Sequence, residues 1–404
     1  MIGQKITKCL SQPVNKFLSV LKRPRVKKNR IFVSFAAISI VIAIFFFIEN
    51  NTADSDFNFF TIDCDIYNRN GKLVFRVYSQ LCSFADDGKV LASNHHENTL
   101  SMTNSAGDTL WTAHENIHHD LKFSNDQKSL LLISGEVIEF KGRLVRSDCF
   151  SKRDLENKII GEWCLSANIP QLEKLGFTIS MWPNTWQPGY PTDEISHANT
   201  IYEIPANLLS EKYPPFREGN FLVDLHKPIY ALLILDSKMK TILWSKSLEK
   251  WPYGIQRLNF SAHDSQVTPE GKILSYFNWY KVDEPPVQNW NNITRYSRSF
   301  LAFNWHSNLV EFDPYLDSIN WIYESAPPEK FRSGARGSVT SLKNKNYLFS
   351  DITESSVIYE VNRRREIIWK FEVPKYGGAT SAPKVQKVKP MYNPAFLRAR
   401  RIID

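Results

Sequence analysis

A short pattern, a turn followed by an apolar strand that ends in an aromatic residue, recurs along most of the chain. Strands this short cannot form a core alone, so such units must stack on one another to bury their apolar faces. The recurrence therefore limits the fold to repeated β-sheet architectures. The six copies are GKLVF (71–75), GDTLW (107–111), NKIIGEW (157–163), KTILW (240–244), DSINW (317–321) and REIIW (365–369).

A second pattern, a polar turn followed by a strand, alternates with the first. Each pair of patterns behaves as two strands of one four-stranded sheet, and such sheets stack around an axis as propeller blades. We therefore expect an all-β, six-bladed β-propeller, with an irregular β-sandwich as the alternative. The copies are DDGKVLASN (86–94), NDQKSLLLIS (125–134), EGNFLVDLH (218–226), PEGKILSYFN (269–278) and KNKNYLFSD (343–351).

Three further expectations follow from this pattern. The recurring aromatic ring fits the space between adjacent blades. The C-terminal segment, residues 371–404, is predicted to close the ring by supplying a last strand. Only KRDLEN (152–157) and QLEKLG (171–176) suggest short helices.

The N-terminus differs from the rest of the chain. Residues 1–30 carry nine Lys or Arg residues and no acid, and residues 31–48 carry no charge. A run of eighteen uncharged, mostly apolar residues can just span a bilayer. We predict a cytoplasmic basic tail (1–30), a transmembrane helix (31–48), a linker (49–58) and an exported propeller (59–404). A cleaved signal peptide is the alternative, but no small-residue cleavage pattern follows the run.

The charge balance supports this topology. The chain has a net charge of +8, and the tail supplies nine positive charges, so residues 49–404 hold 41 Lys and Arg against 42 Asp and Glu. The basicity thus indicates membrane orientation, and we expect no nucleic-acid partner. The predicted location is the inner (plasma) membrane, with the propeller on the periplasmic or other extracytoplasmic side.

Four of the five cysteines lie in the predicted exported domain. An oxidising compartment favours disulfides. The close spacings favour Cys64–Cys82 and Cys149–Cys164, with buried free thiols as the alternative.

Histidines lie at similar points in three of the repeats, upstream of the second pattern. They are His118–His119 before NDQKSLLLIS, His197 before EGNFLVDLH and His263 before PEGKILSYFN. Equivalent positions of successive blades face one end of the central channel, so we expect these imidazoles to converge. For any single histidine, a hydrogen-bonded loop position is the plainer interpretation.

Arginines follow the histidines along the chain. Arg298, Arg332 and Arg336 could form a cationic channel mouth for an anion, because guanidinium groups bind oxyanions through paired N–H donors. Salt bridges at the surface are the plainer interpretation. No cysteine or histidine spacing indicates a metal site, and we expect neither a metal nor a cofactor.

The order of these motifs resembles the bacterial arylsulfate sulfotransferase family over about residues 60–400. The matching segments are HHD (118–120), HAN (197–199), HD (263–264), SR (297–298) and RGS (336–338). The resemblance implies a six-bladed propeller. It also implies transfer of a sulfuryl group from an aryl sulfate to a phenolic or hydroxyl acceptor through a transient sulfohistidine, without a nucleotide donor.

The resemblance also assigns site residues. By position, His197, His263 and Arg298 would be catalytic. Asn199 would bind the substrate, a small anionic ligand such as an aryl sulfate. We expect His119, from the repeated histidines, and Arg336, from the cationic channel mouth, to bind it too. Imidazoles and guanidinium groups suit sulfuryl transfer, which needs a nucleophile, positioning and charge stabilisation.

One departure from the family divides the functional hypotheses. The family's nucleophilic histidine follows the SR arginine, whereas the only histidine after Arg298 here is His306, in a strand-like segment. Either His263 or His197 takes this role, or the protein is a non-catalytic propeller that binds a ligand or an envelope protein. A quinone-dependent dehydrogenase propeller would need a carboxylate cluster for calcium and more blades.

Overall fold

We analysed a computed structural model of the chain. It describes residues 57–94, 97–183, 191, 193–249, 257–281, 304–324, 331, 333, 337–351, 356–374, 385 and 387–404. The predicted basic tail and the predicted transmembrane segment, residues 31–48, lie outside these residues. Within the described ranges, no helix is long and apolar enough to cross a bilayer.

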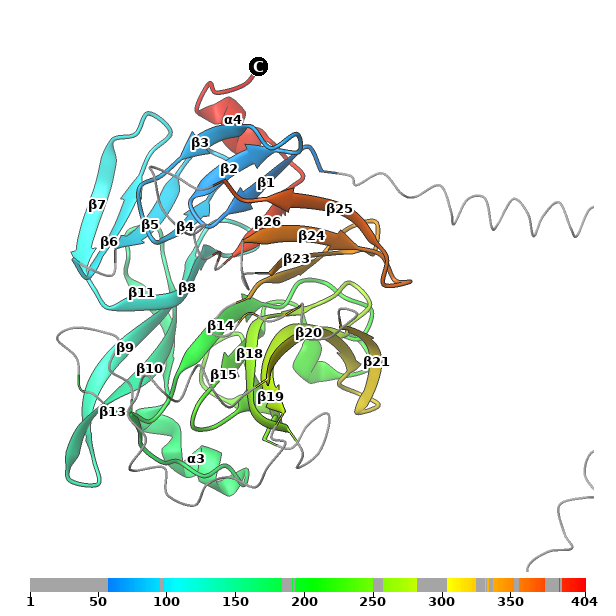
Figure 1. The fold of residues 1–404 in the computed structure, drawn as a ribbon. Helices are drawn as coiled ribbons and strands as arrows, with labels where there is room; N and C mark the ends of the chain where they lie inside the picture. The colour runs from blue at the N-terminus through cyan, green and yellow to red at the C-terminus, as the bar shows by residue number, and fades with distance from the viewer. Residues whose placement is uncertain are drawn as a thin grey trace, which may run out of the picture. The chain divides into compact units, whose positions relative to one another are not determined.

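Six antiparallel sheets of four principal strands each form the blades of a propeller (Figure 1). This confirms the predicted fold class and blade number. In chain order, blades 1 to 3 contain β1 (Phe59–Ile62), β2 (Asp65–Asn68) and β3 (Leu73–Arg76); β4 (Leu81–Phe84), β5 (Val90–Asn94), β6 (Thr99–Thr103) and β7 (Thr109–His114); and β8 (Ile117–Phe123), β9 (Leu130–Phe140), β10 (Arg143–Arg153) and β11 (Ile159–Cys164).

Blades 4 to 6 follow the same order of strands. They contain β14 (Ala198–Glu203), β15 (Phe221–Leu225), β16 (Ala231–Leu235) and β17 (Ile242–Ser247); β18 (Arg257–Val267), β19 (Ile273–Lys281), β20 (Asn304–Asp313) and β21 (Ser318–Tyr323); and β22 (Val339–Ser341), β23 (Tyr347–Asp351), β24 (Val357–Val361) and β25 (Ile367–Glu372). The first strand of each of these blades is innermost.

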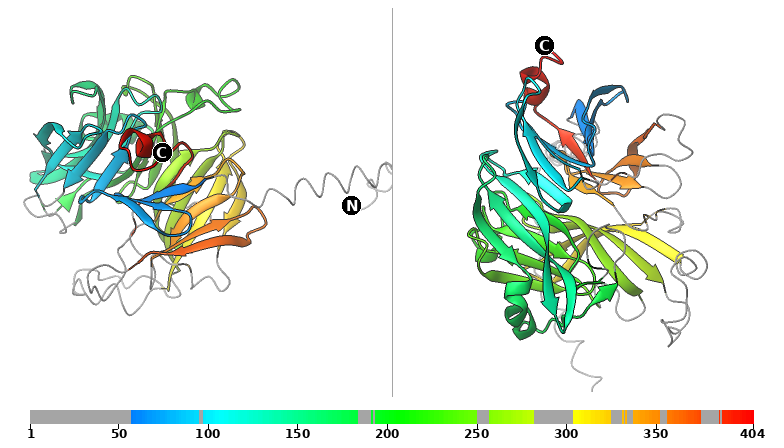
Figure 2. Two further views of the ribbon diagram at one scale, coloured as in Figure 1. Left: turned by 90° about the horizontal axis from the view of Figure 1, so that it is seen from above. Right: turned by 90° about the vertical axis from the view of Figure 1, so that its left-hand side faces the viewer.

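The C-terminal strand β26 (Val388–Met391) closes the ring. It pairs antiparallel with β1, Val388 opposite Ile62, and so becomes the innermost strand of blade 1 (Figure 2). This confirms the prediction that the C-terminal segment supplies the last strand. Pairing the two ends of the propeller removes an exposed sheet edge. The short helix α4 (Ala395–Ala399) follows, and Phe396 contacts Phe75 of blade 1 and Phe84 of blade 2.

The recurring aromatic residues lie on the outermost strands and reach the next blade. Trp111 of blade 2 donates its indole N–H to the Leu155 carbonyl of blade 3 at 2.7 Å. Trp321 of blade 5 donates to the Arg363 carbonyl of blade 6 at 3.0 Å. The prediction that these rings fill the space between blades is confirmed at these junctions. A buried indole needs a partner for its N–H, which explains the recurring carbonyl acceptors.

Blade 3 carries an insertion that leads to the site. The helices η1 (Ser166–Asn168) and α3 (Ile169–Lys174) follow β11, and β12 (Trp182–Pro183) pairs with β13 (Asp193–Glu194). Strand β13 then joins β10 in parallel. In blade 4, η2 (Pro214–Phe216) precedes β15. The helix predicted at QLEKLG exists as α3, whereas KRDLEN forms the end of β10 and its turn, because Asp154 accepts backbone N–H groups there.

Two disulfides are formed, one between the turn that follows β1 and strand β4, and one between strands β10 and β11. Cys64 bonds to Cys82 with Cα atoms 5.1 Å apart, joining blades 1 and 2. Cys149 bonds to Cys164 with Cα atoms 4.0 Å apart, within blade 3. The predicted connectivity is therefore confirmed.

Candidate functional site

The innermost strands of blades 3, 4 and 5 are irregular at equivalent points. Their pairing shifts between Ile117 and Leu121, between Ala198 and Thr200, and between His263 and Gln266. Such bulges re-aim side chains that a regular strand would direct alternately into the two faces of the blade.

Two residues at these bulges adopt a left-handed backbone. His119 has φ +59° and Asp264 has φ +50°. Residues other than glycine seldom adopt this conformation, although Asp and His do so more readily than most. The local backbone strain therefore coincides with the polar residues that face the axis.

Five imidazoles lie in a continuous row at one end of the axis. Successive ring centroids are 4.9 Å apart for His118 and His119, 4.6 Å for His119 and His197, 5.8 Å for His197 and His226, and 6.4 Å for His226 and His263. Blades 3, 4 and 5 all contribute, as the repeat predicted. We call these five residues the imidazole pocket.

A carboxylate orients His197 within the imidazole pocket. Its Nδ1 lies 2.9 Å from Glu194 Oε1 on β13. Arg146 on β10 also pairs with Glu194 and lies 3.3 Å from the same nitrogen. The carboxylate contact is the shorter, so we assign the Nδ1 proton to a hydrogen bond with Glu194. That tautomer places the ring's lone pair on Nε2.

His118 and Asp148 form a second carboxylate–imidazole pair. Nε2 lies 2.6 Å from Asp148 Oδ1, and the Ala198 amide donates to the other carboxylate oxygen at 2.7 Å. Burial opposes ionisation of Asp148, but the charges of His118 and Arg146 outweigh it and lower its pKa to about 2. Burial also lowers the pKa of His118, against the attraction of Asp148. The short contact between the ring and the carboxylate therefore joins the two buried groups.

His119 remains neutral at physiological pH. Burial, followed by repulsion from His197 and His118, holds its pKa well below the ordinary value. Its neighbours in the pocket therefore favour an uncharged ring. Neutral imidazoles can accept a proton or donate a hydrogen bond when a ligand arrives.

Asp120 and Asp264 directly follow His119 and His263 along the inner strands, and they belong to a network of lysines and aspartates. We call it the axial ion network. The Lys387 and Lys389 ammonium groups lie 3.0 Å from Asp264. Lys122 lies 2.7 Å from Asp120. The charged lysines hold the pKa of Asp264 well below its usual range despite burial. The network ties the closing strand β26 to blade 5.

Asp224 is a fully buried carboxyl beside these groups. It accepts hydrogen bonds from the Asn199 amide at 3.1 Å and from the Ser265 hydroxyl at 2.9 Å. Burial raises its pKa to about 7, because these hydrogen bonds and the charge of Lys387 offset only part of the lost hydration.

The structure brings together most of the residues that the sequence singled out. His119, His197 and His263 belong to the imidazole pocket. Asn199 is buried beside it and donates its side-chain amide to the Ala262 carbonyl at 2.8 Å, which links blades 4 and 5. Arg298, Arg332 and Arg336 lie outside the described residues. His306 lies on β20, the third strand of blade 5, away from the inner strands.

Sequence reasoning missed several residues of the site. His226 closes the second-strand pattern EGNFLVDLH, and its place at a strand end could have indicated it. Glu194 precedes His197 by three residues. Arg146 and Asp148 gave no signal, because they lie on β10, a strand that neither repeated pattern marked.

Metal ligands do not gather in the described part of the pocket. Among the described residues, the only three metal-type ligand atoms within 4.8 Å of one another belong to Glu136, Cys149 and Cys164. The two cysteines form a disulfide, so they cannot bind a metal as thiolates.

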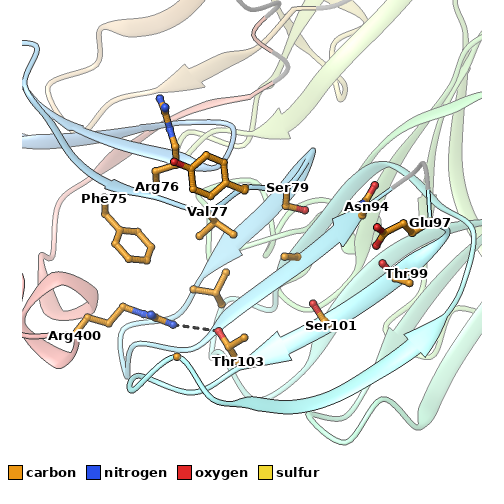
Figure 3. A pocket seen from close by; sticks show the side chains of 14 residues that line it. Phe75, Arg76, Val77, Ser79, Asn94, Glu97, Thr99, Ser101, Thr103 and Arg400 are labelled. Atoms are coloured by element: carbon orange, nitrogen blue, oxygen red, sulfur yellow. Dashed lines mark hydrogen bonds between the residues drawn. The ribbon is translucent and has the colours of Figure 1, made fainter. Parts of the chain in front are cut away.

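A polar groove of about 510 Å³ lies elsewhere, against β3, β5 and β6 (Figure 3). Its lining includes Arg76 and Arg400, and none of the five imidazoles lines it. Arg400 is already engaged, donating to the Gly88 carbonyl at 2.8 Å and to the Thr103 hydroxyl at 3.2 Å. Arg76 is paired with Asp65.

No protein-family model and no curated protein sequence matches the chain. Similar solved structures include a protein of unknown function from Bacteroides caccae, at 10% identity and a TM-score of 0.46, covering 83% of this chain and 99% of that one. Dihydro-heme d1 dehydrogenase NirN has 10% identity, a TM-score of 0.35, and coverages of 84% and 76%. BamB from Moraxella catarrhalis has 9% identity, a TM-score of 0.34, and coverages of 78% and 81%.

Proposed function

We propose that the imidazole pocket binds an aryl sulfate and transfers its sulfuryl group to a phenolic or hydroxyl acceptor. The observation that carries this proposal is the orientation of His197 by Glu194 among four other imidazoles. A neutral imidazole whose Nδ1–H is held by a carboxylate presents its Nε2 lone pair as a nucleophile. His197 is partly exposed, so a ligand can reach it, whereas His118 is fully buried.

The proposed reaction has two steps. In the first, His197 Nε2 forms a bond to sulfur as the sulfur–oxygen bond to the aryl group breaks, and the phenolate leaves. In the second, an acceptor hydroxyl attacks the same sulfur, loses its proton to a base and displaces the imidazole. The neighbouring His119 and His263 would donate hydrogen bonds to the sulfuryl oxygens as negative charge develops.

The test is release of 4-nitrophenolate from 4-nitrophenyl sulfate by the full-length protein in detergent, with phenol as acceptor. We expect release that depends on phenol and is abolished in His197→Ala. His114→Ala is the matched control, because His114 is exposed on the outermost strand of blade 2. Release that is unchanged in His197→Ala would overturn the assignment of His197.

The second candidate is a non-catalytic propeller that binds an anionic ligand or an envelope protein. The absence of any histidine on the described strands of blade 6, and the place of His306 on β20, favour it. It predicts no release of 4-nitrophenolate by the wild-type protein, together with anion binding that is lost in His197→Ala.

The proposal includes the location of the protein. Residues 31–48 would anchor it in the inner membrane, with the N-terminus in the cytoplasm and the propeller in the periplasm or another extracytoplasmic space. Both disulfides support an oxidising compartment. Removal of residues 1–48, with a secretory signal supplied instead, should release the protein from the membrane fraction.

A further inference from the structure

The insertion after blade 3 brings an indole to the edge of the imidazole pocket. Trp182 on β12 is the cross-strand partner of Glu194 on β13, and Glu194 is the parallel partner of Arg146 on β10. Directly opposed residues in a sheet project from the same face. Trp182, Glu194 and Arg146 therefore form a row on one face, and Glu194 contacts His197.

A lysine from blade 4 meets this row. Lys227 directly follows His226 of the pocket, and its Nζ lies 4.6 Å from the centroid of the Trp182 ring. Among the described residues, no carboxylate lies within ion-pair distance of this ammonium group. Glu194 acts on it only at longer range. A largely buried cation without a close counter-ion favours an incoming anion.

The indole is open to a ligand. Trp182 is 38% exposed, although its cross-strand partner Glu194 is buried. Lys227 covers part of the ring by a cation–π contact, and the remaining surface can stack against another aromatic group. A cation and an aromatic surface side by side match a ligand that carries a negative charge on an aromatic ring.

We infer that Trp182 and Lys227 form the subsite of the imidazole pocket that recognises the aryl part of the ligand, with the ring stacked on the indole and the ammonium group facing the negative charge. The inference rests on the proposed function, since it assumes that an oxyanion occupies the imidazole pocket. It adds the prediction that aryl ligands are preferred to alkyl ligands, and it assigns this preference to two residues.

The test compares benzenesulfonate with methanesulfonate by calorimetric titration of the full-length protein in detergent. Both carry the same oxyanion, and neither has an ester bond to break, so binding is measured without turnover. We expect the wild-type protein to bind benzenesulfonate about five- to tenfold more tightly. Trp182→Leu should abolish this preference and leave the affinity for methanesulfonate unchanged, and Trp182→Phe should retain part of the preference.

The role of Lys227 is tested separately, by the pH dependence of sulfonate binding. Burial lowers its pKa to about 8, so its positive charge is lost as the pH rises through this value. Binding of both sulfonates should weaken across that interval in the wild-type protein, and Lys227→Arg should remove the weakening. Lys227→Gln should bind both sulfonates about tenfold more weakly at pH 7. Lys343→Gln is the matched control, because Lys343 lies over Tyr392 on another part of the propeller.

The outcomes separate the two proposals. Tight binding of methanesulfonate without a preference for benzenesulfonate, or a preference that survives in Trp182→Leu, would overturn the aryl subsite alone. If neither sulfonate binds to the wild-type protein, the proposed function and the subsite both fail.

Discussion

The imidazole pocket and the axial ion network occupy neighbouring levels of one axis, yet their buried polar groups are stabilised in opposite ways. The network pairs full charges: the ammonium groups of Lys387, just before β26, and of Lys389, on β26, lie 3.0 Å from Asp264. The pocket gathers rings whose burial and mutual repulsion favour the neutral form, as at His119. Paired ions fix a geometry, whereas neutral imidazoles remain able to exchange protons and partners. This difference supports our proposal that the network holds the ring closed whereas the pocket binds a ligand.

The largest expected effect is on the network. Asp264→Asn retains the shape of the side chain and tolerates the left-handed backbone. It removes the charge that both ammonium groups contact, and it leaves Lys387 with the more distant Asp120, 3.6 Å away. We expect a loss of about 3–5 kcal/mol in the free energy of unfolding, measured with urea. Asp317→Asn is the control, because its ion pair with Lys246 lies at the surface and should contribute less than about 1 kcal/mol. Equal effects of the two substitutions would contradict the role of the network.

Asp224, beside the network, should make stability depend on pH. Its folded pKa, about 7, is raised from the ordinary 3.8, so its stabilising contribution is complete below about pH 4 and is lost as the pH rises to 7. The difference corresponds to about 4 kcal/mol at most. Urea unfolding at several pH values should show this loss in the wild-type protein, and Asp224→Asn should flatten the profile. A profile unchanged by the substitution would show that Asp224 is ionised throughout.

Asp148, on the pocket side, has the opposite sign. Its folded pKa, about 2, is depressed from 3.8, so its contribution is present above about pH 4 and is lost as the pH falls toward 2. The shift corresponds to about 2 kcal/mol. Asp148→Asn should remove this acid-sensitive part of the unfolding curve. It should also weaken anion binding, because His118 would lose the carboxylate that orients it. If Asp148→Asn left the loss of stability below about pH 4 unchanged, the pairing of Asp148 with His118 would be contradicted.

The smallest effect on stability should come from the pocket itself. His119→Asn places a residue that tolerates the left-handed backbone at φ +59°. We expect less than about 1 kcal/mol in unfolding free energy but at least a tenfold loss of benzenesulfonate affinity. A large destabilisation with unchanged binding would reverse the roles assigned to the two regions.

The sequence was sufficient for the repeated elements and insufficient for the contacts between them. The aromatic residue in each outermost strand indicated six blades, because it recurs wherever a junction between blades must be filled. The histidines at equivalent points indicated a convergent site for the same reason. Arg146 and Glu194 were not recognisable, since an irregular insertion pairs β13 with β10 and no repeat predicts that pairing. The role of Lys387 and Lys389 in the axial ion network could not be predicted, because the sequence does not show that β26 is an innermost strand.

The central claim, that an oxyanion binds in the imidazole pocket, is tested most directly by a crystal structure of the protein soaked with benzenesulfonate. We predict a sulfonate group within hydrogen-bonding distance of His197 and His119, with its ring on Trp182. A pocket filled by side chains, or a sulfonate bound only in the groove beside Arg76 and Arg400, would contradict the account.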